Sequence, residues 1–430
     1  MNAARVFVKS FGCSTNLADG EVLAGCLAEA GYKIVDFPSN ADLIIYNTCA
    51  VKGPTENRMI EILKRVSASK KLVVAGCLPL INFERLCREV RFDGVVGPAV
   101  GDGIVDVVRR VLMGEQVIAL KGALKAKPSL KLPRVRLNPV VSIVPINYGC
   151  LGSCAYCCVV FARGRLRSYG VREVVERVRQ DVGSGVREFW LTSQDTACYG
   201  LDLNTNLAEL LHAVCAVNGD FKVRVGMMTP NMAAAMLNDL IQAFKSEKVF
   251  KFLHLPLQSG DDKILRRMQR FYTVEDFKRI VKAFKTNFSM LTLATDIICG
   301  FPGESEKAFE KTMQLIADIK PDIVNISKFF ARPKTAAAKM PNSVSLPEIK
   351  RRSAAASSLA RQIAYENNQR WIGWTGEILI DEVGRAGSWV GRNFAYKLIV
   401  VKTADNMLGK TVKAKVVKAF STHLEGEIVE

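Results

Sequence analysis

The sequence predicts an α/β protein of three domains: an open parallel αβ sheet, a partial (βα)6 barrel and a small all-β barrel of OB-like type. The chain has 430 residues, which is too long for one ordinary hydrophobic core. Apolar strand patterns alternate with helical patterns as far as about residue 368, as is typical of parallel sheets. Beyond that point, apolar and polar residues alternate between glycines, which predicts antiparallel strands.

Residues 1–120 are expected to form the open parallel sheet. The strand patterns RVFVKSFG, DLIIYNTC and KLVVAGC are separated by helical patterns over about 16–30 and 55–68. Cys13, Cys49 and Cys77 each fall at the carboxyl end of one of these strands. Because the carboxyl ends of parallel strands form the ligand crevice of such a sheet, we expect the three thiols to converge. The pattern predicts a site built from three thiolates.

Residues 121–139 are expected to be a basic linker. The segment KGALKAKPSLKLPRVRLNP has three prolines, six cationic residues and no acidic one, which predicts an extended chain running over the surface. The window 121–180 carries twelve Lys or Arg against two acidic residues, in a chain of net charge +18. Such a block beside a cysteine motif favours a polyanionic partner such as nucleic acid over a merely solvated basic surface.

Residues 140–368 are expected to form the barrel. Strand patterns near VVSIVPIN, EFWLTSQ, KVRVGMM, KFLHLPLQ, LATDIICG and IVNISKFF alternate with helices, which predicts six parallel strands with the chemistry on the loops that follow them. Cys150, Cys154 and Cys157 form a C-x3-C-x2-C run after the first strand. Three thiolates on a four-iron cube leave one iron open to a small molecule. The alternative is a zinc site with Cys158 as fourth ligand, although adjacent cysteines are awkward ligands for one tetrahedral ion.

Residues 369–430 are expected to form the small β-barrel, a fold often used to bind RNA. Their charge is nearly balanced, so this expectation rests on the fold type. The N-terminal segment MNAARVFVKSFGC has none of the features of a signal peptide. No apolar run reaches the ~18 residues of a membrane span. A cytoplasmic location without membrane contact is therefore expected.

Several motifs resemble those of one enzyme family. The C-x3-C-x2-C run, with Tyr156 before its third cysteine, is similar to the motif of radical S-adenosylmethionine (SAM) enzymes. KSFGCSTNLADGE, NTCAVKGPTE and VAGCLP resemble the N-terminal domain of the methylthiotransferases. HLPLQSGDDKILRRMQR and TDIICGFPGE match barrel motifs of that family, and residues 369–430 resemble its tRNA-binding TRAM domain. The resemblance therefore covers the whole chain.

This resemblance implies two [4Fe-4S] clusters and S-adenosyl-L-methionine as cofactors. Cys150, Cys154 and Cys157 would hold the cluster that cleaves SAM to a 5′-deoxyadenosyl radical. The N-terminal cysteines would hold a second cluster that presents sulfur to carbon 2 of an adenine, and a second SAM supplies the methyl group. No catalytic residue beyond the clusters is expected. The implied partners are tRNA, an electron donor such as ferredoxin or flavodoxin, and a sulfur donor, and no obligate protein partner is inferred.

Further residues are expected around SAM, although buried polar residues at strand ends can equally belong to the scaffold. The backbone at Tyr156 should meet the adenine. The segment TSQD ends the second strand, where the family pattern Gly-Gln becomes Ser193–Gln194. The residues expected to bind the cofactor are Tyr156, Thr192, Ser193, Gln194, Asp195, Gln258, Ser259 and Asp296.

Three alternating arginines, Arg163, Arg165 and Arg167, follow the cysteine run. We expect them to form a basic ridge that grips tRNA phosphates while one base is turned into the site, with three solvated arginines as the alternative. His254 is expected to be a core residue, and no histidine is assigned to catalysis.

NTCAVKGPTE and CLGSCAYCCVVFARGRLRSY resemble most the archaeal and eukaryotic branch of the family. That branch converts N6-threonylcarbamoyladenosine at position 37 of tRNA, directly 3′ of the anticodon, to its 2-methylthio derivative. The alternatives are a methylthiotransferase for isopentenyladenosine, a radical SAM RNA methylase without sulfur insertion, and a non-enzymatic iron–sulfur RNA-binding sensor. The basic window argues against the family's ribosomal-protein substrate. A methylase has no need of the N-terminal cysteines, and a sensor has no use for the barrel.

Overall fold

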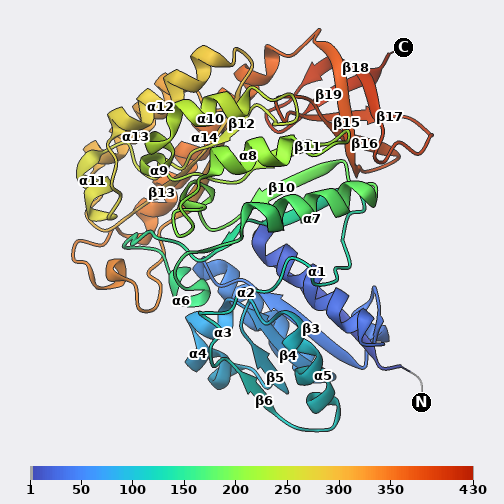
Figure 1. Cartoon of the computed structure of the whole chain (residues 1–430). Coiled ribbons are helices and arrows are strands. Elements are labelled where there is room, and N and C mark those ends of the chain that lie inside the picture. Colours follow the sequence, from blue (N-terminus) through green and yellow to red (C-terminus); the bar gives the residue numbers. More distant parts are fainter. Residues whose placement is uncertain (1–2, 430) are drawn as a thin grey trace.

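The computed structural model describes residues 3–429. Its elements form three domains in chain order: a parallel sheet with helices on both faces, a six-stranded parallel barrel and a small closed β-barrel. In Figure 1 the N-terminal domain lies at the bottom, the large barrel at the upper left and the C-terminal barrel at the upper right. The α/β class predicted from the sequence is confirmed.

The N-terminal sheet has the strand order β2-β1-β3-β4-β5-β6, and all its neighbouring pairs are parallel. Helices α1 and α5 cover one face, and α2, α3 and α4 cover the other. Because β1, β3 and β4 are neighbours, the chain segments that follow them leave the sheet side by side. The strands are β1 (Arg5–Ser10), β2 (Lys33–Ile34), β3 (Leu43–Thr48), β4 (Lys71–Gly76), β5 (Gly94–Val96) and β6 (Val117–Ala119). The helices are α1 (Ser14–Glu29), α2 (Gly53–Ser67), α3 (Leu78–Ile81), α4 (Phe83–Glu89) and α5 (Ile104–Leu112), with 3-10 turns at Pro38–Asn40 and Gly101–Gly103.

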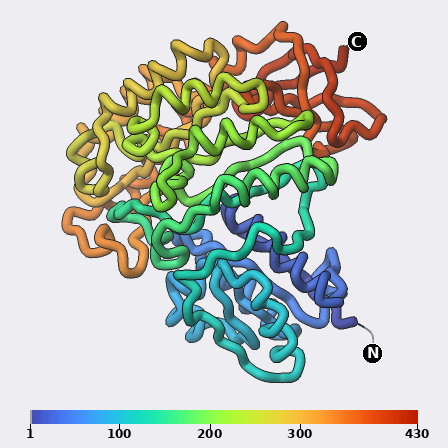
Figure 2. The backbone as a smooth tube through the Cα atoms, viewed as in Figure 1, coloured from blue at the N-terminus to red at the C-terminus, as the bar shows by residue number. Residues whose placement is uncertain are grey.

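Residues 121–139 contain no helix or strand, and all except Leu130 are at least partly exposed, so they run over the surface as expected. The Val135 amide donates to the Glu21 carbonyl at 3.0 Å, and a Cβ added at Gly25 would meet the Pro133 carbonyl oxygen at 2.2 Å. The linker therefore lies directly on α1, as the neighbouring blue and teal tubes in Figure 2 show. A glycine on the helix allows this close approach, which composition alone does not reveal.

The central domain has the six parallel strands that the sequence predicts. They form two three-stranded sheets, β11-β10-β7 and β12-β13-β14, joined by one bridge between Val223 and Val249. The strands are β7 (Val141–Pro145), β10 (Glu188–Thr192), β11 (Lys222–Val225), β12 (Phe252–His254), β13 (Thr292–Cys299) and β14 (Ile323–Lys328). The helices are α7 (Val171–Gly183), α8 (Leu207–Cys215), α9 (Pro230–Ala235), α10 (Leu237–Phe244), α11 (Asp262–Arg267), α12 (Val274–Asn287), α13 (Glu306–Ile319) and α14 (Leu346–Gln369). Shorter elements are β8 (Asn147–Tyr148), α6 (Val160–Arg163), β9 (Arg167–Ser168) and 3-10 turns at Thr196–Cys198 and Ala336–Lys339.

The C-terminal domain is a closed barrel of five strands in the order β15-β16-β17-β19-β18. The predicted small barrel is confirmed, but the prediction that it is antiparallel throughout is wrong for one pair, since β17 and β19 are parallel. An odd number of strands cannot alternate in direction all the way round a closed barrel, so one parallel pair is unavoidable. The strands are β15 (Thr375–Val383), β16 (Ser388–Arg392), β17 (Leu398–Lys402), β18 (Thr411–Ala419) and β19 (Leu424–Ile428).

Within residues 3–429, no helix combines the length and the apolar character that crossing a membrane requires.

Candidate functional site

The barrel cysteines lie on a loop between β8 and α6 that is fixed on several sides. The Ala155 amide donates to the Met268 carbonyl at 2.9 Å, and the Ala337 amide donates to the Ala155 carbonyl at 2.8 Å. Gly149 begins the loop with φ +75°, and its amide donates to Gln194 Oε1 at 2.7 Å. The loop is therefore held by other loops and turns of the barrel domain.

Hydrogen-bond donors point at the sulfurs of this loop. The Gly152 amide donates to Cys150 Sγ at 3.1 Å, and Arg270 Nη1 donates to Cys154 Sγ at 3.3 Å. A Cβ added at Gly152 would lie 3.3 Å and 3.7 Å from those two sulfurs, so a side chain there would crowd them. Donors to sulfur stabilise thiolates, the form in which cysteine binds iron. Sequence reasoning missed Arg270, although it lies in the quoted motif HLPLQSGDDKILRRMQR.

The electrostatic surroundings of Cys157 and Cys150 in this loop differ. Burial raises the pKa of Cys157, and the neighbouring Cys154 and Cys150 add to the rise. A hydrogen bond with Cys198 lowers the pKa of Cys150. Cys198, which sequence reasoning placed in the core, is buried beside the cysteine loop. Metal binding at this loop would release protons.

Cys13, Cys49 and Cys77 come together at the carboxyl edge of the N-terminal sheet. They follow the adjacent strands β1, β3 and β4, as the sequence predicts. Burial, together with the electrostatic influence of Cys13 and Cys49, raises the pKa of Cys77 to about 12. Burial also raises the pKa of Cys49, with Cys13 acting in the same direction. Cys13 is thus close enough to influence the ionisation of the other two thiols.

A buried arginine faces the N-terminal cysteines. Arg163 is 2% exposed and forms a salt bridge with Asp19 at 2.6 Å. Its guanidinium opposes the rise in the pKa of Cys77 and of Cys49, while its own Nη1 is buried without a hydrogen-bond partner within residues 3–429. A cluster of thiolates and sulfide would give that nitrogen an acceptor, so these residues fit an anionic group.

The predicted arginine ridge is wrong for two of its three residues. Arg163 is buried under the N-terminal domain, as described above. Arg167 turns inward and donates from Nη1 to the Arg165 carbonyl at 2.7 Å and from Nη2 to the Ala126 carbonyl at 3.0 Å. Arg165 alone of the three is exposed.

The segments that carry the two cysteine groups touch at the domain interface. Cys158, which directly follows Cys157, has its Sγ 4.0 Å from the carbonyl oxygen of Ala50, which directly follows Cys49. The interface is closed by a buried salt bridge between Arg332 of the barrel and Glu56 of α2. One ligand residue of each predicted site therefore lies next to the contact between the domains.

Within residues 3–429, no three His, Cys, Asp or Glu side chains are arranged to hold a single metal ion. Each thiolate of a four-iron cube binds a different iron, so the ligands of a cube stand farther apart than the ligands of one ion. Cys158, the fourth ligand in the zinc alternative, points instead to Ala50. Both three-cysteine groups are compatible with a cube.

The residues predicted around SAM divide into two kinds. Ser193, Asp195 and Ser259 serve the backbone: both serine hydroxyls accept from amides two residues on, and the buried Asp195 accepts from the amides of Ala197 and Thr229. The others contact side chains or lie on or after barrel strands. The ring of Tyr156 packs edge-on to Phe301, and the hydroxyl of Thr192 lies 3.5 Å from that of Thr15. The remaining three are Gln194, Gln258 and Asp296.

Gln194, Gln258 and Asp296 belong to the barrel strands β10, β12 and β13 or to the segments that follow them, and each has a different environment. Gln194 holds the cysteine loop through Gly149. Gln258 is buried with φ +69°, a backbone strain that is concentrated at functional sites. Asp296 accepts hydrogen bonds from His254 and Asn325, and the charge of Lys52, three residues after Cys49, helps to lower its pKa against the effect of burial. His254 is thus a partner of Asp296 and not simply a core residue.

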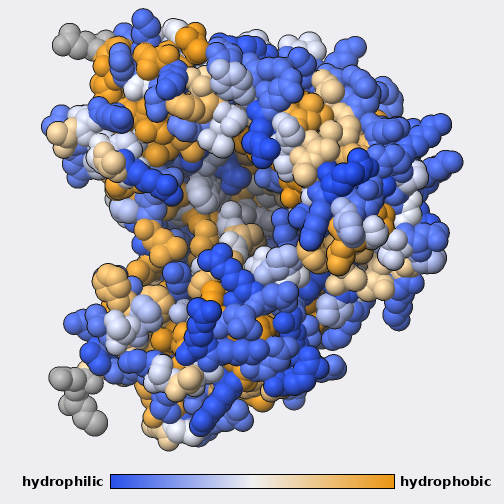
Figure 3. Space-filling model, turned by 180° about the vertical axis from the view of Figure 1, so that it is seen from behind, coloured by the Kyte–Doolittle hydropathy of each residue, from blue (hydrophilic) through white to orange (hydrophobic). Residues whose placement is uncertain are grey.

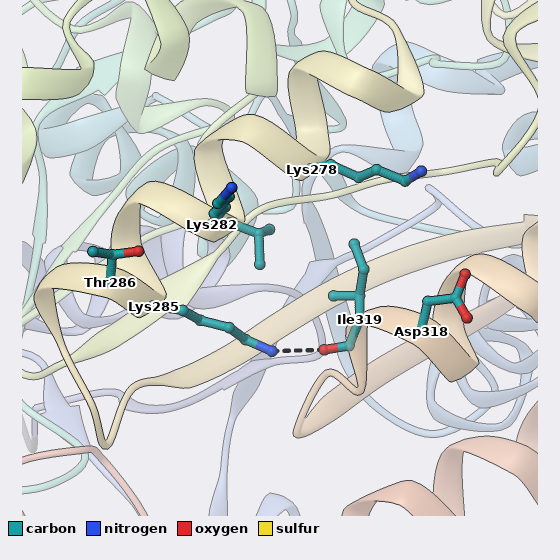
Figure 4. A pocket seen from close by; sticks show the side chains of 7 residues that line it. Lys278, Lys282, Lys285, Thr286, Asp318 and Ile319 are labelled. Atoms are coloured by element: carbon teal, nitrogen blue, oxygen red, sulfur yellow. Dashed lines mark hydrogen bonds between the residues drawn. The ribbon is translucent and has the colours of Figure 1, made fainter.

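The surface is deeply hollowed between the N-terminal domain, below, and the other two domains, above (Figure 3). A separate groove of about 360 Å³ lies on the outer helical layer. Figure 4 shows it between α12, which contributes Lys278, Lys282 and Lys285, and the end of α13, where Lys285 Nζ donates to the Ile319 carbonyl at 2.6 Å. None of the predicted site residues lines that groove.

Comparison with known families finds three matches along the chain. Residues 5–97 match the uncharacterized protein family UPF0004, residues 144–316 the radical SAM superfamily and residues 369–429 the TRAM domain. These matches occur in the order that the sequence motifs predict.

Relatives from archaea and eukaryotes match the whole chain. A protein of Pyrococcus abyssi named "Probable threonylcarbamoyladenosine tRNA methylthiotransferase" is 42% identical, over 99% of this chain and 99% of its own. The "Threonylcarbamoyladenosine tRNA methylthiotransferase" of Xenopus laevis is 36% identical, over 99% of this chain and 77% of its own.

Solved structures share the fold alone. The radical SAM methyltransferase TsrM from Kitasatospora setae, with tryptophan and a SAM analogue bound, has a TM-score of 0.55 at 13% identity and covers 78% of this chain and 75% of its own. The cobalamin-dependent radical enzyme OxsB has a TM-score of 0.53 at 10% identity over 83% of this chain and 56% of its own.

Proposed function

Because the chain belongs to the threonylcarbamoyladenosine tRNA methylthiotransferases, we propose that it converts N6-threonylcarbamoyladenosine in tRNA, directly 3′ of the anticodon, to the 2-methylthio derivative. The reaction replaces the hydrogen on carbon 2 of the adenine by a sulfur that is then methylated. SAM serves both as the source of the radical and as the methyl donor. A separate sulfur donor supplies the reduced sulfur.

One observation carries this proposal beyond a simple radical methylase. The segment that follows Cys49 touches the end of the barrel cysteine loop at the domain interface, where Cys158 Sγ lies 4.0 Å from the Ala50 carbonyl oxygen. A methylase needs only the barrel group. Two cysteine groups on either side of one interface suit a reaction in which hydrogen leaves and sulfur arrives at the same carbon.

The proposed residue roles follow from this arrangement. Cys150, Cys154 and Cys157 hold one cluster, and Cys13, Cys49 and Cys77 hold the other. When bound, the barrel cluster supplies the electron that cleaves SAM to a hydrogen-abstracting radical, and the N-terminal cluster supplies the place for sulfur. Arg270 and Gly152 orient and stabilise the barrel thiolates, and Arg163 balances negative charge at the N-terminal group.

The tRNA is proposed to lie across the hollow between the domains, where its anticodon loop can reach both cysteine groups (Figure 3). The C-terminal barrel and the exposed Arg165 are the proposed contacts to the sugar-phosphate backbone. A base must leave the stack to reach a site between two domains, and the bases of a loop are the least costly to turn out.

The test is product analysis with anaerobically reconstituted enzyme, SAM, a reductant and two tRNAs. One tRNA carries threonylcarbamoyladenosine and the other isopentenyladenosine. Mass spectrometry of the nucleosides should show the 2-methylthio form of the first only. A methyl group on carbon 2 without sulfur would identify a methylase, and no SAM cleavage at all would identify a binding protein.

A further inference from the structure

A second cavity lies where the inner faces of the barrel strands meet the C-terminal barrel. Its volume is about 310 Å³, within the usual range of small-ligand pockets, about 300–1,000 Å³. The barrel contributes Arg224, His254, Thr292 and Asn325 to its wall, and the C-terminal domain contributes Arg392 and Tyr396. None of these residues has a role in holding the proposed clusters.

Arg224 is the cation of this cavity whose charge is not matched by a carboxylate. Its guanidinium carbon lies 5.4 Å from the ring centre of Trp190, 5.2 Å from that of Phe252 and 5.4 Å from that of Tyr396. In the part of the chain that the structure describes, it forms no salt bridge, and its buried Nε has no hydrogen-bond partner. Aromatic faces stabilise such a cation but leave its N–H edge free for an anion.

The other two cations of the cavity are already paired. Arg392 Nε lies 3.2 Å from Asp381, and Lys397 Nζ lies 2.7 Å from Asp322. Their charges are therefore compensated within the protein. Arg224 is left as the group that an incoming anion would neutralise.

A second polar atom in the cavity wall also lacks a partner. Thr292 is 1% exposed, and its hydroxyl oxygen makes no hydrogen bond to any described residue. Buried polar atoms are nearly always hydrogen-bonded in native proteins. Two unpartnered polar atoms in one cavity indicate a ligand that offers both negative charge and further hydrogen bonds.

The cavity lies next to Asp296, one of the residues predicted to bind SAM. His254 and Asn325 line the cavity, and both bond Asp296, at 3.2 Å and 2.7 Å. A group bound beside His254 and Asn325 would therefore lie close to the predicted SAM site.

We propose that this cavity receives the threonylcarbamoyl group of the substrate and that Arg224 binds its carboxylate. The inference rests on the proposed function and names the residue that would select this nucleoside. The group carries one carboxylate, one hydroxyl and a urea-like linkage, which match the guanidinium edge, the Thr292 hydroxyl and the polar side chains of His254 and Asn325. An isopentenyl group has no charge and would leave the Arg224 edge buried without an acceptor.

The geometry of adenine suits this placement. Its N6, which carries the group, and its carbon 2, which reacts, lie on the same edge of the base. A nucleoside that presents carbon 2 to the clusters therefore presents its N6 substituent to a neighbouring part of the barrel interior. A pocket for the substituent therefore has to lie close to the place where carbon 2 reacts, and the cavity beside Asp296 is the one that we assign to it.

The test compares three labelled anticodon stem-loops on the reconstituted holoenzyme under anaerobic conditions. They carry threonylcarbamoyladenosine, its neutral carboxamide analogue, or unmodified adenosine at the same position. For the wild type, we expect the Kd of the carboxamide to exceed that of the acid by about 10-fold or more, equivalent to about 1.4 kcal/mol per tenfold. For Arg224→Gln, the three Kd values should converge on that of the unmodified loop. Arg224→Lys keeps the positive charge but loses the planar guanidinium with its paired N–H donors. Its Kd values should therefore lie between those of the wild type and those of Arg224→Gln.

The matched control is Lys222→Gln, which removes a cation from the same strand outside the cavity and should keep the wild-type preference. If Arg224→Gln weakens all three loops equally, the arginine binds a backbone phosphate and the proposal is wrong. If the preference for the acid survives Arg224→Gln, the proposal is equally wrong. If that variant loses its iron or its fold, the acid–carboxamide comparison on the wild type still decides whether the protein recognises the carboxylate. A wild type that prefers the acid but makes no 2-methylthio product would overturn the proposed function instead.

Discussion

At the scale of single residues, the two cysteine groups have different means of balancing thiolate charge. The barrel group receives hydrogen bonds from Arg270 and the Gly152 amide. The N-terminal group lies near the positive charge of Arg163, which also forms a salt bridge with the carboxylate of Asp19. The two sites therefore need not lose metal together.

Replacing Cys49 by Ala tests the division of labour between the groups. We expect SAM cleavage to 5′-deoxyadenosine to persist within a factor of about two, because the barrel loop is untouched, while 2-methylthio product falls below detection. Both products are measured by mass spectrometry in one reaction. Cys87→Ala is the matched control, since Cys87 is an exposed cysteine of the same domain and its removal should change neither product. Continued sulfur insertion by Cys49→Ala would contradict the two-group scheme.

The placement of Cys13, Cys49 and Cys77 at strand ends could be predicted because it is local, and the order of the strands then brings these ends together. Sequence reasoning failed for Arg163 because the reason for its burial, Asp19, is 144 residues away in the chain. Arg224 had no sequence signal either, since its aromatic neighbours Trp190, Phe252 and Tyr396 come from three separate elements and two domains.

At the scale of elements, the hairpin of β8 and β9 sets the path of the barrel loop through one glycine. Gly149 has φ +75°, and a Cβ there would lie 2.0 Å from the Arg165 carbonyl oxygen. We expect Gly149→Ala to cost at least about 1–3 kcal/mol from backbone strain alone and to displace the loop. The measurement is iron content after reconstitution, which should fall by about half as one of two clusters is lost.

The control for that change is Gly183→Ala at the end of α7. A Cβ at Gly183 meets no atom within 4 Å. The substitution should leave iron content unchanged and raise stability by about 0.5–1 kcal/mol, because alanine favours helix more than glycine does. Full iron content in Gly149→Ala would show that the hairpin does not position the loop.

The contact between β10 and the C-terminal barrel should be sensitive to pH. Glu188 is buried, its Oε1 accepts from Tyr396 at 3.2 Å, and burial raises its pKa from 4.5 to about 8, with the carboxyl of Asp381 adding to the rise. A carboxyl whose pKa is higher in the folded than in the unfolded protein makes its full contribution to folding stability below pH 4.5. That contribution is lost as the pH rises through about 8.

We therefore expect the thermal midpoint of the wild type to fall as pH rises from about 5 to about 8, with a slope in stability of up to about 1.4 kcal/mol per pH unit. Glu188→Gln, which keeps the shape without the titration, should flatten this slope. Glu209→Gln removes an exposed glutamate of α8 and should keep the wild-type slope. Equal slopes in all three proteins would mean that Glu188 is ionised throughout.

Strands and helices were largely predictable, because apolar periodicity is a local property of the sequence. The βα units of both sheets and the five-stranded barrel follow that pattern. The path of residues 121–139 was not predictable, because it depends on the gap that Gly25 leaves on α1. The parallel pair β17–β19 was missed because it follows from closing the barrel and not from any one strand.

At the scale of the whole molecule, the arrangement brings three domains around one hollow (Figure 3). Helices α1 and α2 of the first domain close the barrel on the side of its cysteine loop, through Asp19 and Glu56. The C-terminal barrel closes another side, next to Arg224. A substrate that enters the hollow would touch all three domains, which explains why a tRNA loop suits this site better than a small molecule.

Each three-cysteine group is proposed to hold its own iron–sulfur cube. The most direct measurement is iron and sulfide content with Mössbauer spectra after anaerobic reconstitution, on the wild type and on the variant with Cys13→Ala, Cys49→Ala and Cys77→Ala. Two four-iron cubes predict about eight irons in the wild type and about four in the variant. About four irons in both proteins would contradict the account and make the N-terminal cysteines part of the core.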